Sequence, residues 1–151
     1  MTASRWAGWL LTVSLLGGTA QAADDITVTA PWIRATVAQA TATGVFMQIT
    51  AKHDARLLAV KSSIGRAELH QMAMEGQTMS MRPVDGVDLP AGQPVNLASG
   101  GLHVMLMDLK RQVREGDVVP LTLVIQEKGK KPQNVEVKAP VKALSYLPPK
   151  P

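Results

Sequence analysis

The sequence of 151 residues contains no cysteine. This absence excludes disulfide bonds, a lipid-modified cysteine and thiolate coordination of a metal ion for this sequence. Aromatic residues are also scarce, at 3% of the chain, so aliphatic and methionine side chains must fill most of the hydrophobic core. The stability of such a chain depends on that core, because no covalent cross-link contributes to it.

The sequence also lacks runs of charge. The formal net charge is +4, charged residues make up 19% of the chain, and the basic residues are dispersed. A nucleic-acid-binding surface is not expected, because no basic run is interleaved with aromatic residues. The hydrophobic content of 46% is typical of a globular protein, and the length suits one domain with a single core.

The amino-terminal segment has the pattern of a secretory signal peptide. Arg5 and the amino terminus supply positive charge, residues 6–17 are mainly apolar, and Ala20-Gln-Ala22 resembles a cleavage site. The apolar segment is too short to span a bilayer comfortably, so no membrane span is expected after cleavage. We predict a signal peptide over residues 1–22, cleaved after Ala22 or Ala23, and a periplasmic location.

The rest of the chain reads as an all-β domain. Apolar residues alternate with polar ones in about eight or nine short segments, separated by turn signals such as Glu75-Gly76, and no amphipathic helix is evident. This pattern predicts a single-domain Greek-key β-sandwich over residues 23–144, followed by a flexible proline-rich tail at residues 145–151. The expected strands cover residues 24–30, 44–50, 55–62, 65–74, 79–81, 95–97, 102–109, 119–125 and 135–137.

Histidine and methionine are concentrated in one part of this domain. His70, Met72 and Met74 occupy alternate positions, and the same His-x-Met-x-Met order recurs at residues 103–107. All but two of the eight methionines lie within residues 72–107. Because side chains of a strand alternate between its faces, each of these strands presents imidazole and thioether on one side. Thioether ligands with some imidazole favour Cu(I) over hard and borderline ions.

Core packing is the alternative explanation for methionine, because this flexible apolar side chain fills irregular gaps. The other expected strands use mainly valine and isoleucine, however, so the concentration of methionine in and beside the histidine-bearing strands favours a metal site. His53 lies in a polar loop without a nearby methionine and is expected at the surface. We do not expect an enzyme, because no catalytic constellation of serine, histidine and carboxylate residues is recognisable.

The spacing of these residues resembles a known family. His70 is followed after ten residues by Met81, then after twenty-one residues by His103, and after one more residue by Met105. The chain thereby resembles the PCuAC family of periplasmic copper chaperones, whose motif has these four residues at these spacings. Further segments of the family pattern are residues 86–92, 100–105 and 115–117, together with Ala30-Pro-Trp32 and Gly44-Val-Phe46, so the resemblance covers nearly the whole mature chain.

This resemblance implies a cupredoxin-like β-sandwich that binds one Cu(I) near its surface through His70, Met81, His103 and Met105. It also implies delivery of copper to the CuA centre of cytochrome c oxidase, on subunit II, directly or through an intermediary copper chaperone. Some members bind Cu(II) through a carboxy-terminal extension rich in histidine and methionine. This sequence has neither residue after Met107, so that second site is not expected. We expect a monomer.

Some roles stay open at this level. Met72 and Met107 share strand faces with the motif residues and are either additional copper ligands or packing residues. Glu68 is a candidate hydrogen-bond acceptor for an imidazole N–H group of His70. Two other functions remain: an exported interaction module whose methionine-rich strands, including Met74 and Met79, form an apolar patch for a partner protein, and a periplasmic copper buffer without a dedicated acceptor.

Overall fold

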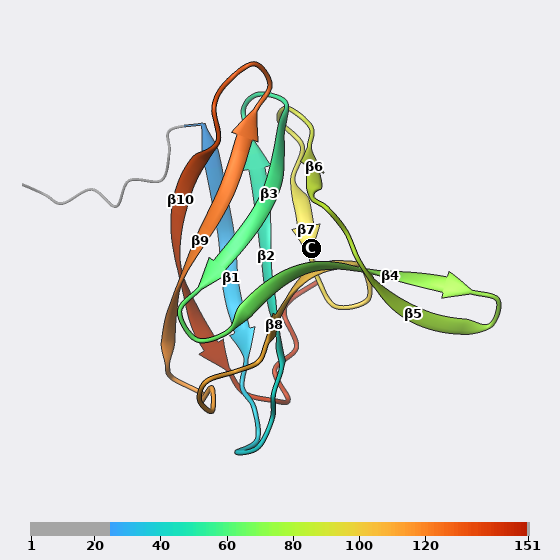
Figure 1. Ribbon diagram of the computed structural model, residues 1–151, viewed down its shortest axis with the longest axis vertical. Coiled ribbons are helices and arrows are strands. Elements are labelled where there is room, and N and C mark those ends of the chain that lie inside the picture. The colour runs from blue at the N-terminus through green and yellow to red at the C-terminus, as the bar shows by residue number, and fades with distance from the viewer. Residues whose placement is uncertain (1–24, 151) are drawn as a thin grey trace, which may run out of the picture.

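The computed structural model describes residues 25–150, which form ten β-strands and no helix (Figure 1). The all-β class is therefore confirmed. No segment of this part of the chain meets the requirements of a membrane-spanning helix. The predicted signal peptide lies outside the described residues. The strands are β1 (Ile26–Arg34), β2 (Thr43–Ala51), β3 (Ala55–Ser62), β4 (Arg66–Glu75), β5 (Thr78–Pro83), β6 (Val87–Leu89), β7 (Val95–Leu97), β8 (Leu102–Met107), β9 (Val118–Glu127) and β10 (Gln133–Lys142).

The strands form one continuous hydrogen-bonded path in the order β5-β4-β8-β2-β1-β10-β9-β3-β6, and β7 pairs with β2 beside β8. Strand β10 is the corner of this path. It runs antiparallel to β9 over residues 133–140 and then parallel to β1 at Val141 and Lys142. Two layers result, one containing β4, β8, β2 and β1 and the other containing β10, β9 and β3 (Figure 1).

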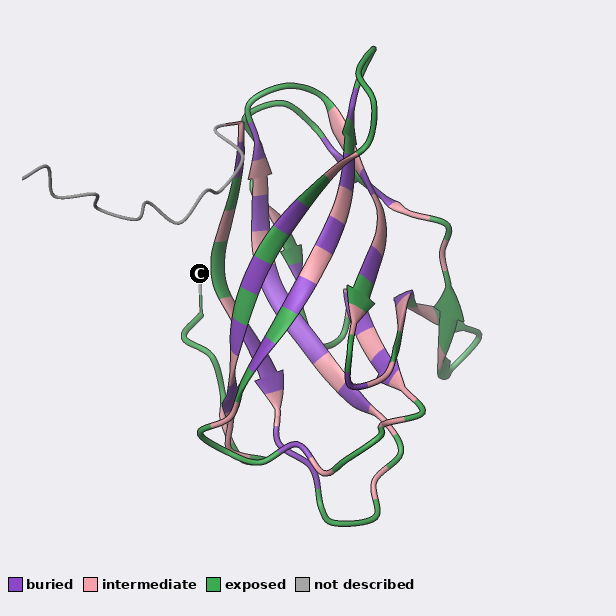
Figure 2. Ribbon diagram, turned by 60° about the vertical axis from the view of Figure 1, so that its left-hand side comes forward, coloured by how far each residue is buried: buried purple, intermediate pink, exposed green. Residues whose placement is uncertain are grey.

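The core lies between these layers. Buried and less buried residues alternate along the long strands (Figure 2), as expected when one face of each strand packs inward. Leu121, Leu123 and Ile125 of β9 have at most 1% of their surface exposed, and full burial of each such side chain contributes about 1.5–3 kcal/mol. Met47 is the single methionine that the described core contains, so aliphatic side chains fill it as the composition predicted.

The predicted bounds of β3 and β7 are those observed, whereas the predicted β1 was too short. Strand β1 continues to Arg34 because a bulge between Thr29 and Trp32 places Pro31 where no ladder hydrogen bond is required. Ala30, at a φ of 48°, provides the local turn. The predicted strand is too short because Pro31 is unfavourable inside a regular strand, whereas the bulge accommodates it.

The prediction also missed one strand and ended another too early. The prediction missed β6, whose three residues lie between two turn signals, and it ended β10 at Val137 instead of Lys142. Inward alternation continues through Ala139 and Val141, but alanine and proline have low strand propensity, which hid the pattern. Beyond β10, the ring of Tyr146 packs edge-on against Trp32 with centroids 4.9 Å apart.

Candidate metal site

Strand register brings the histidines and methionines of β4, β5 and β8 onto one face, which we call the ligand face. His70 of β4 lies directly opposite His103 of β8, and Met72 of β4 lies directly opposite Met81 of β5. Directly opposed residues share a face, and so do residues two apart on one strand. The opposite face of β8 points into the core, where Leu106 is fully buried. The local fold therefore separates core residues from candidate ligands by simple alternation.

His103 and Met81 are in contact. His103 Nδ1 lies 2.9 Å from the carbonyl oxygen of Gly101, and its Nε2 lies 3.1 Å from Met81 Sδ. A carbonyl oxygen only accepts, so Nδ1 carries the proton and donates it. In the neutral ring, Nε2 then has a free electron pair facing the thioether sulfur. Two electron-pair donors from different strands thus converge at one point.

His70 is oriented in a similar way. Its Nε2–H group donates to Glu68 Oε2 at 2.8 Å, and Glu68 in turn forms an ion pair with Arg66. The other ring nitrogen, Nδ1, is buried and has no hydrogen-bond partner within the described chain. Unpaired buried polar atoms are rare in proteins because they have lost their hydration. A ligating nitrogen is one explanation for such an atom.

The structure places the other candidate ligands at different distances from this pair of histidines. The His70 and His103 ring centroids are 6.1 Å apart. Met105 follows His103 by two residues on the same face and lies opposite Glu68, whereas Met107 lies one step further away, opposite Arg66. Met72 and Met81 form the next rung beyond His70. The two histidines and Met81 are therefore the centre of the group, and Met107 is at its edge.

The candidate ligands differ in how far they are buried. His70 and His103 are 8% and 6% exposed, whereas Met81 is 45% exposed. The two imidazoles are therefore buried within the group, and Met81 lies on its solvent side.

Phe46 lies beside the site, although the search for ligand residues in the sequence gives no reason to expect it there. The Phe46 ring packs 6.5 Å from the His103 ring and 4.6 Å from Trp32, centroid to centroid. Gly44 makes room for it, because a Cβ atom there would approach the Phe46 ring to 2.5 Å. This ring helps to bury His103. The sequence feature that indicates this packing is Gly44, two residues before Phe46, in a chain with few aromatic residues.

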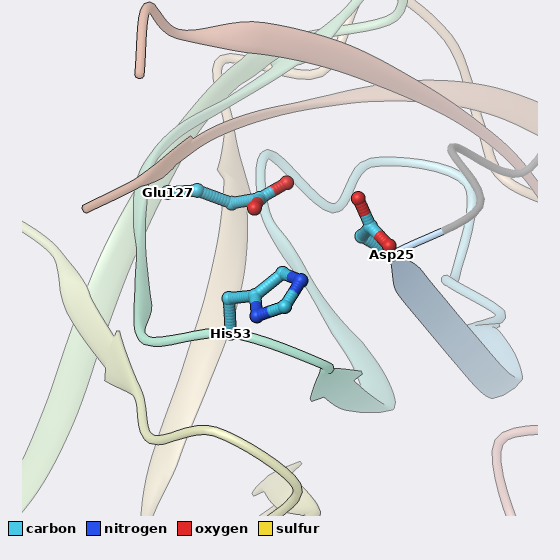
Figure 3. A group of neighbouring side chains, drawn as sticks. All are labelled: Asp25, His53 and Glu127. Atoms are coloured by element: carbon cyan, nitrogen blue, oxygen red, sulfur yellow. The ribbon is translucent and has the colours of Figure 1, made fainter. Parts of the chain in front are cut away.

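A second group of polar side chains lies elsewhere. Asp25, His53 and Glu127 each offer one ligand atom within 4.8 Å of the others, and Figure 3 shows them converging. Lys130 Nζ already lies 2.8 Å from Glu127 Oε2 and 3.9 Å from Asp25 Oδ2, and its hydrogen bond to Glu127 raises the pKa of Lys130. A lysine ammonium thus supplies the positive charge here. His53 is exposed, as its loop position indicated.

Comparison with known proteins identifies the family. The LpqE-like family, described as "Putative lipoprotein LpqE-like", matches residues 26–141. The protein described as "Putative lipoprotein Lxx21020" of Leifsonia xyli subsp. xyli is 30% identical over 118 residues, which cover 77% of this chain and 71% of that protein. The copper-bound PCuAC domain of PmoF2 superposes with a TM-score of 0.66 at 29% identity, covering 82% of this chain and 97% of that domain. This chain belongs to the PCuAC family.

Another solved structure of a PCuAC relative extends the comparison. The Cu(I) form of DR1885 from Deinococcus radiodurans is 26% identical to this chain, with a TM-score of 0.58 and 83% of each chain covered. The PCuAC fold of these relatives is cupredoxin-like, so the predicted fold class is confirmed.

Proposed function

We propose that this PCuAC protein is an exported carrier of one Cu(I) ion, which it binds through His70, Met81, His103 and Met105. The observation that carries the proposal is the 3.1 Å contact between His103 Nε2 and Met81 Sδ, in which the backbone fixes the tautomer that leaves Nε2 free. The export step is supported by the signal-peptide pattern of residues 1–22 and by the lipoprotein descriptions of the relatives.

The chemistry of the four side chains suits Cu(I). Thioether and neutral imidazole are soft to borderline ligands and carry no charge, so they discriminate against hard divalent ions. Methionine needs no deprotonation and cannot be oxidised to a disulfide in an oxidising compartment. Without thiolate, the site holds copper less tightly than a cysteine site would, and this favours transfer over storage. The exposed Met81 is the ligand that an acceptor reaches first.

The family supports a carrier rather than an enzyme. Solved PCuAC relatives include a copper-bound domain and a Cu(I) form. The four residues of this chain have the spacing of the family motif. A blue-copper electron-transfer centre would require a cysteine ligand, which this sequence lacks.

The acceptor that we propose is the CuA site of cytochrome c oxidase subunit II, reached directly or through an intermediary chaperone. The support for it is the family resemblance alone. A copper buffer would have the same site without an acceptor. Deletion of the gene separates these functions: a dedicated carrier predicts low oxidase activity that added copper restores, whereas a buffer predicts copper sensitivity with normal oxidase activity.

Competition titration tests the site itself. Purified protein is titrated with Cu(I) against a chromophoric chelator, together with Met81→Leu and His103→Ala variants. We expect one tight equivalent, weakened by at least about tenfold in each variant, which corresponds to about 1.4 kcal/mol. His53→Ala is the matched control and retains normal affinity, because His53 lies outside the ligand face. Equal affinity of all four proteins would overturn the proposed site and favour the interaction module.

A further inference from the structure

The hairpin formed by β4 and β5 carries methionine beyond the proposed site. Met72 lies directly opposite Met81, and Met74 lies directly opposite Met79. These two rungs are adjacent, and all four thioethers belong to the face that holds His70 and His103. The inner rung reaches the proposed site, because Met81 Sδ contacts His103 Nε2.

Core packing does not account for the outer rung. Met74 is 61% exposed and Met79 is 48% exposed, whereas Met47 in the core is 4% exposed. The hairpin projects away from the body of the molecule (Figure 1), and nearly all of β5 is exposed. Polar residues at positions 74 and 79 would cause no loss of core packing, yet both strands of the hairpin carry methionine there.

The ligand face of the outer hairpin is free of charged residues. Its positions on β4 and β5 beyond His70 are the four methionines. Glu75 and Arg82 fall on the opposite face by alternation, where their side chains form an ion pair at 3.5 Å. Carboxylate ligands for a hard cation are therefore directed away from the methionines. The chemistry that remains on this face is that of soft, neutral sulfur, which favours Cu(I).

The two side chains of the outer rung can reach a single ion. Directly opposed residues have Cβ atoms about 4.5–5.5 Å apart. Methionine has three rotatable bonds, so the sulfur atoms of Met74 and Met79 can turn toward each other between the strands. With no imidazole on this rung, such a site is weaker than the one that contains His70 and His103.

We propose that Met74 and Met79 form an outer Cu(I) site, which receives copper at the hairpin tip and passes it to the inner site. This inference rests on the proposed function. In the transfer step, copper–sulfur bonds to Met74 and Met79 break as bonds to Met81 and the other ligands of the inner site form. Copper remains Cu(I) throughout, and no proton or electron is transferred. Copper moves from the outer to the inner site because the inner site, with its two imidazoles, binds it more tightly.

The test uses the purified protein and a Met74→Leu/Met79→Leu double variant. Leucine keeps the apolar volume of methionine while removing the sulfur. Met47→Leu, in the core, is the matched control for the same chemical change. Cu(I) is supplied as a complex with a weak chelator, and loading is followed by stopped flow. Methionine methyl resonances, labelled with carbon-13, are recorded after each equivalent.

For the wild-type protein, the first equivalent should shift the methyl signals of Met81 and Met105, and a second, weaker equivalent should shift those of Met74 and Met79. The double variant should lose the second equivalent and load the first about tenfold more slowly, with the affinity for the first unchanged. The Met47→Leu variant should behave as wild type.

Normal loading and an unchanged second equivalent in the double variant would overturn this inference while leaving the inner site intact. Normal loading from the small chelator combined with weaker binding of a protein partner would also overturn it, because the hairpin would then be a protein contact. If the wild-type protein takes up no tight equivalent at all, the proposed function fails first.

Discussion

At the residue scale, the important feature is how each histidine is held. A backbone carbonyl fixes His103, whereas a carboxylate fixes His70. Both partners accept a hydrogen bond from one ring nitrogen and leave the other nitrogen available as a ligand. Glu68 also pairs with Arg66, which keeps its carboxylate in position. We therefore expect Glu68 to be a positioning residue, which acts on copper binding through His70 and does not contact the ion itself.

Substitution of Glu68 tests this role. Glu68→Ala should lower Cu(I) affinity by about 10–100-fold, because His70 loses the acceptor that orients it. Glu68→Gln should restore part of the loss, since its amide oxygen still accepts a hydrogen bond. Competition titration measures both, and Glu75→Ala, at the exposed end of the same strand, is the control. Unchanged affinity in Glu68→Ala would mean that the carboxylate does not position the ring.

The sequence predicted these residues but not their contacts. Alternation placed His70 with Met72 and His103 with Met105, and the spacing of the motif added Met81. The pairing of His70 with His103 depends on the register between β4 and β8, which are separated by three other strands in the chain. Register is set by how the inner faces of the strands pack, and the local pattern of each strand does not show which residue of a distant strand it will face.

At the scale of elements, β8 has two separate functions on its two faces. Val104 and Leu106 are fully buried in the core, and His103 and Met105 belong to the ligand face. The strand was predicted at nearly its observed position, because its alternation is regular and Gly100-Gly101 precedes it. Stability and copper binding should therefore be separable by mutations at neighbouring positions.

Variants of Met105 and Leu106 test that separation. Leu106→Ala should lower the free energy of unfolding by about 2–5 kcal/mol, because it leaves a cavity in the core. Met105→Leu should change it by less than about 1.5 kcal/mol but should weaken Cu(I) binding. Denaturant unfolding and copper competition give the two values. If Met105→Leu destabilised the fold as much as Leu106→Ala, Met105 would be a packing residue.

At the scale of the whole molecule, β10 joins the two layers and the β8–β9 connection closes against it. The amide of Val141 donates to the Asp117 carbonyl, and the amide of Gly116 donates to the Val141 carbonyl. The Asp117 carboxylate accepts from the Arg114 backbone amide and from the Arg111 guanidinium. These contacts lower the pKa of Asp117 below its ordinary value. The hydrogen bond from the Arg114 amide has the larger effect, and the hydrogen bond from Arg111 has the next largest.

This network gives stability a dependence on pH. A carboxyl group whose pKa is lower in the folded state stabilises the fold above its unfolded pKa, and the contribution is lost as pH falls through the folded value. Asp117→Asn should therefore lower the melting temperature at pH 7, and the difference from wild type should shrink below a pH of about 4. Thermal melts across this range measure it. A difference that stayed constant would assign the effect to lost geometry instead of charge.

The all-β class followed from alternation, but the parallel pairing of β10 with β1 could not be predicted. The two strands contact through only two register pairs at the end of β10, after a proline that suggested the strand had ended. Such long-range pairings depend on how the layers close around the core and not on local preference.

In the proposed site, imidazole and thioether ligands from three neighbouring strands hold one copper ion. X-ray absorption of the protein loaded with one equivalent of Cu(I) tests it most directly. We expect both sulfur and imidazole nitrogen among the atoms bound to copper, with less sulfur in Met81→Leu and less nitrogen in His103→Ala. A first shell of nitrogen and oxygen alone, unchanged in Met81→Leu, would contradict it.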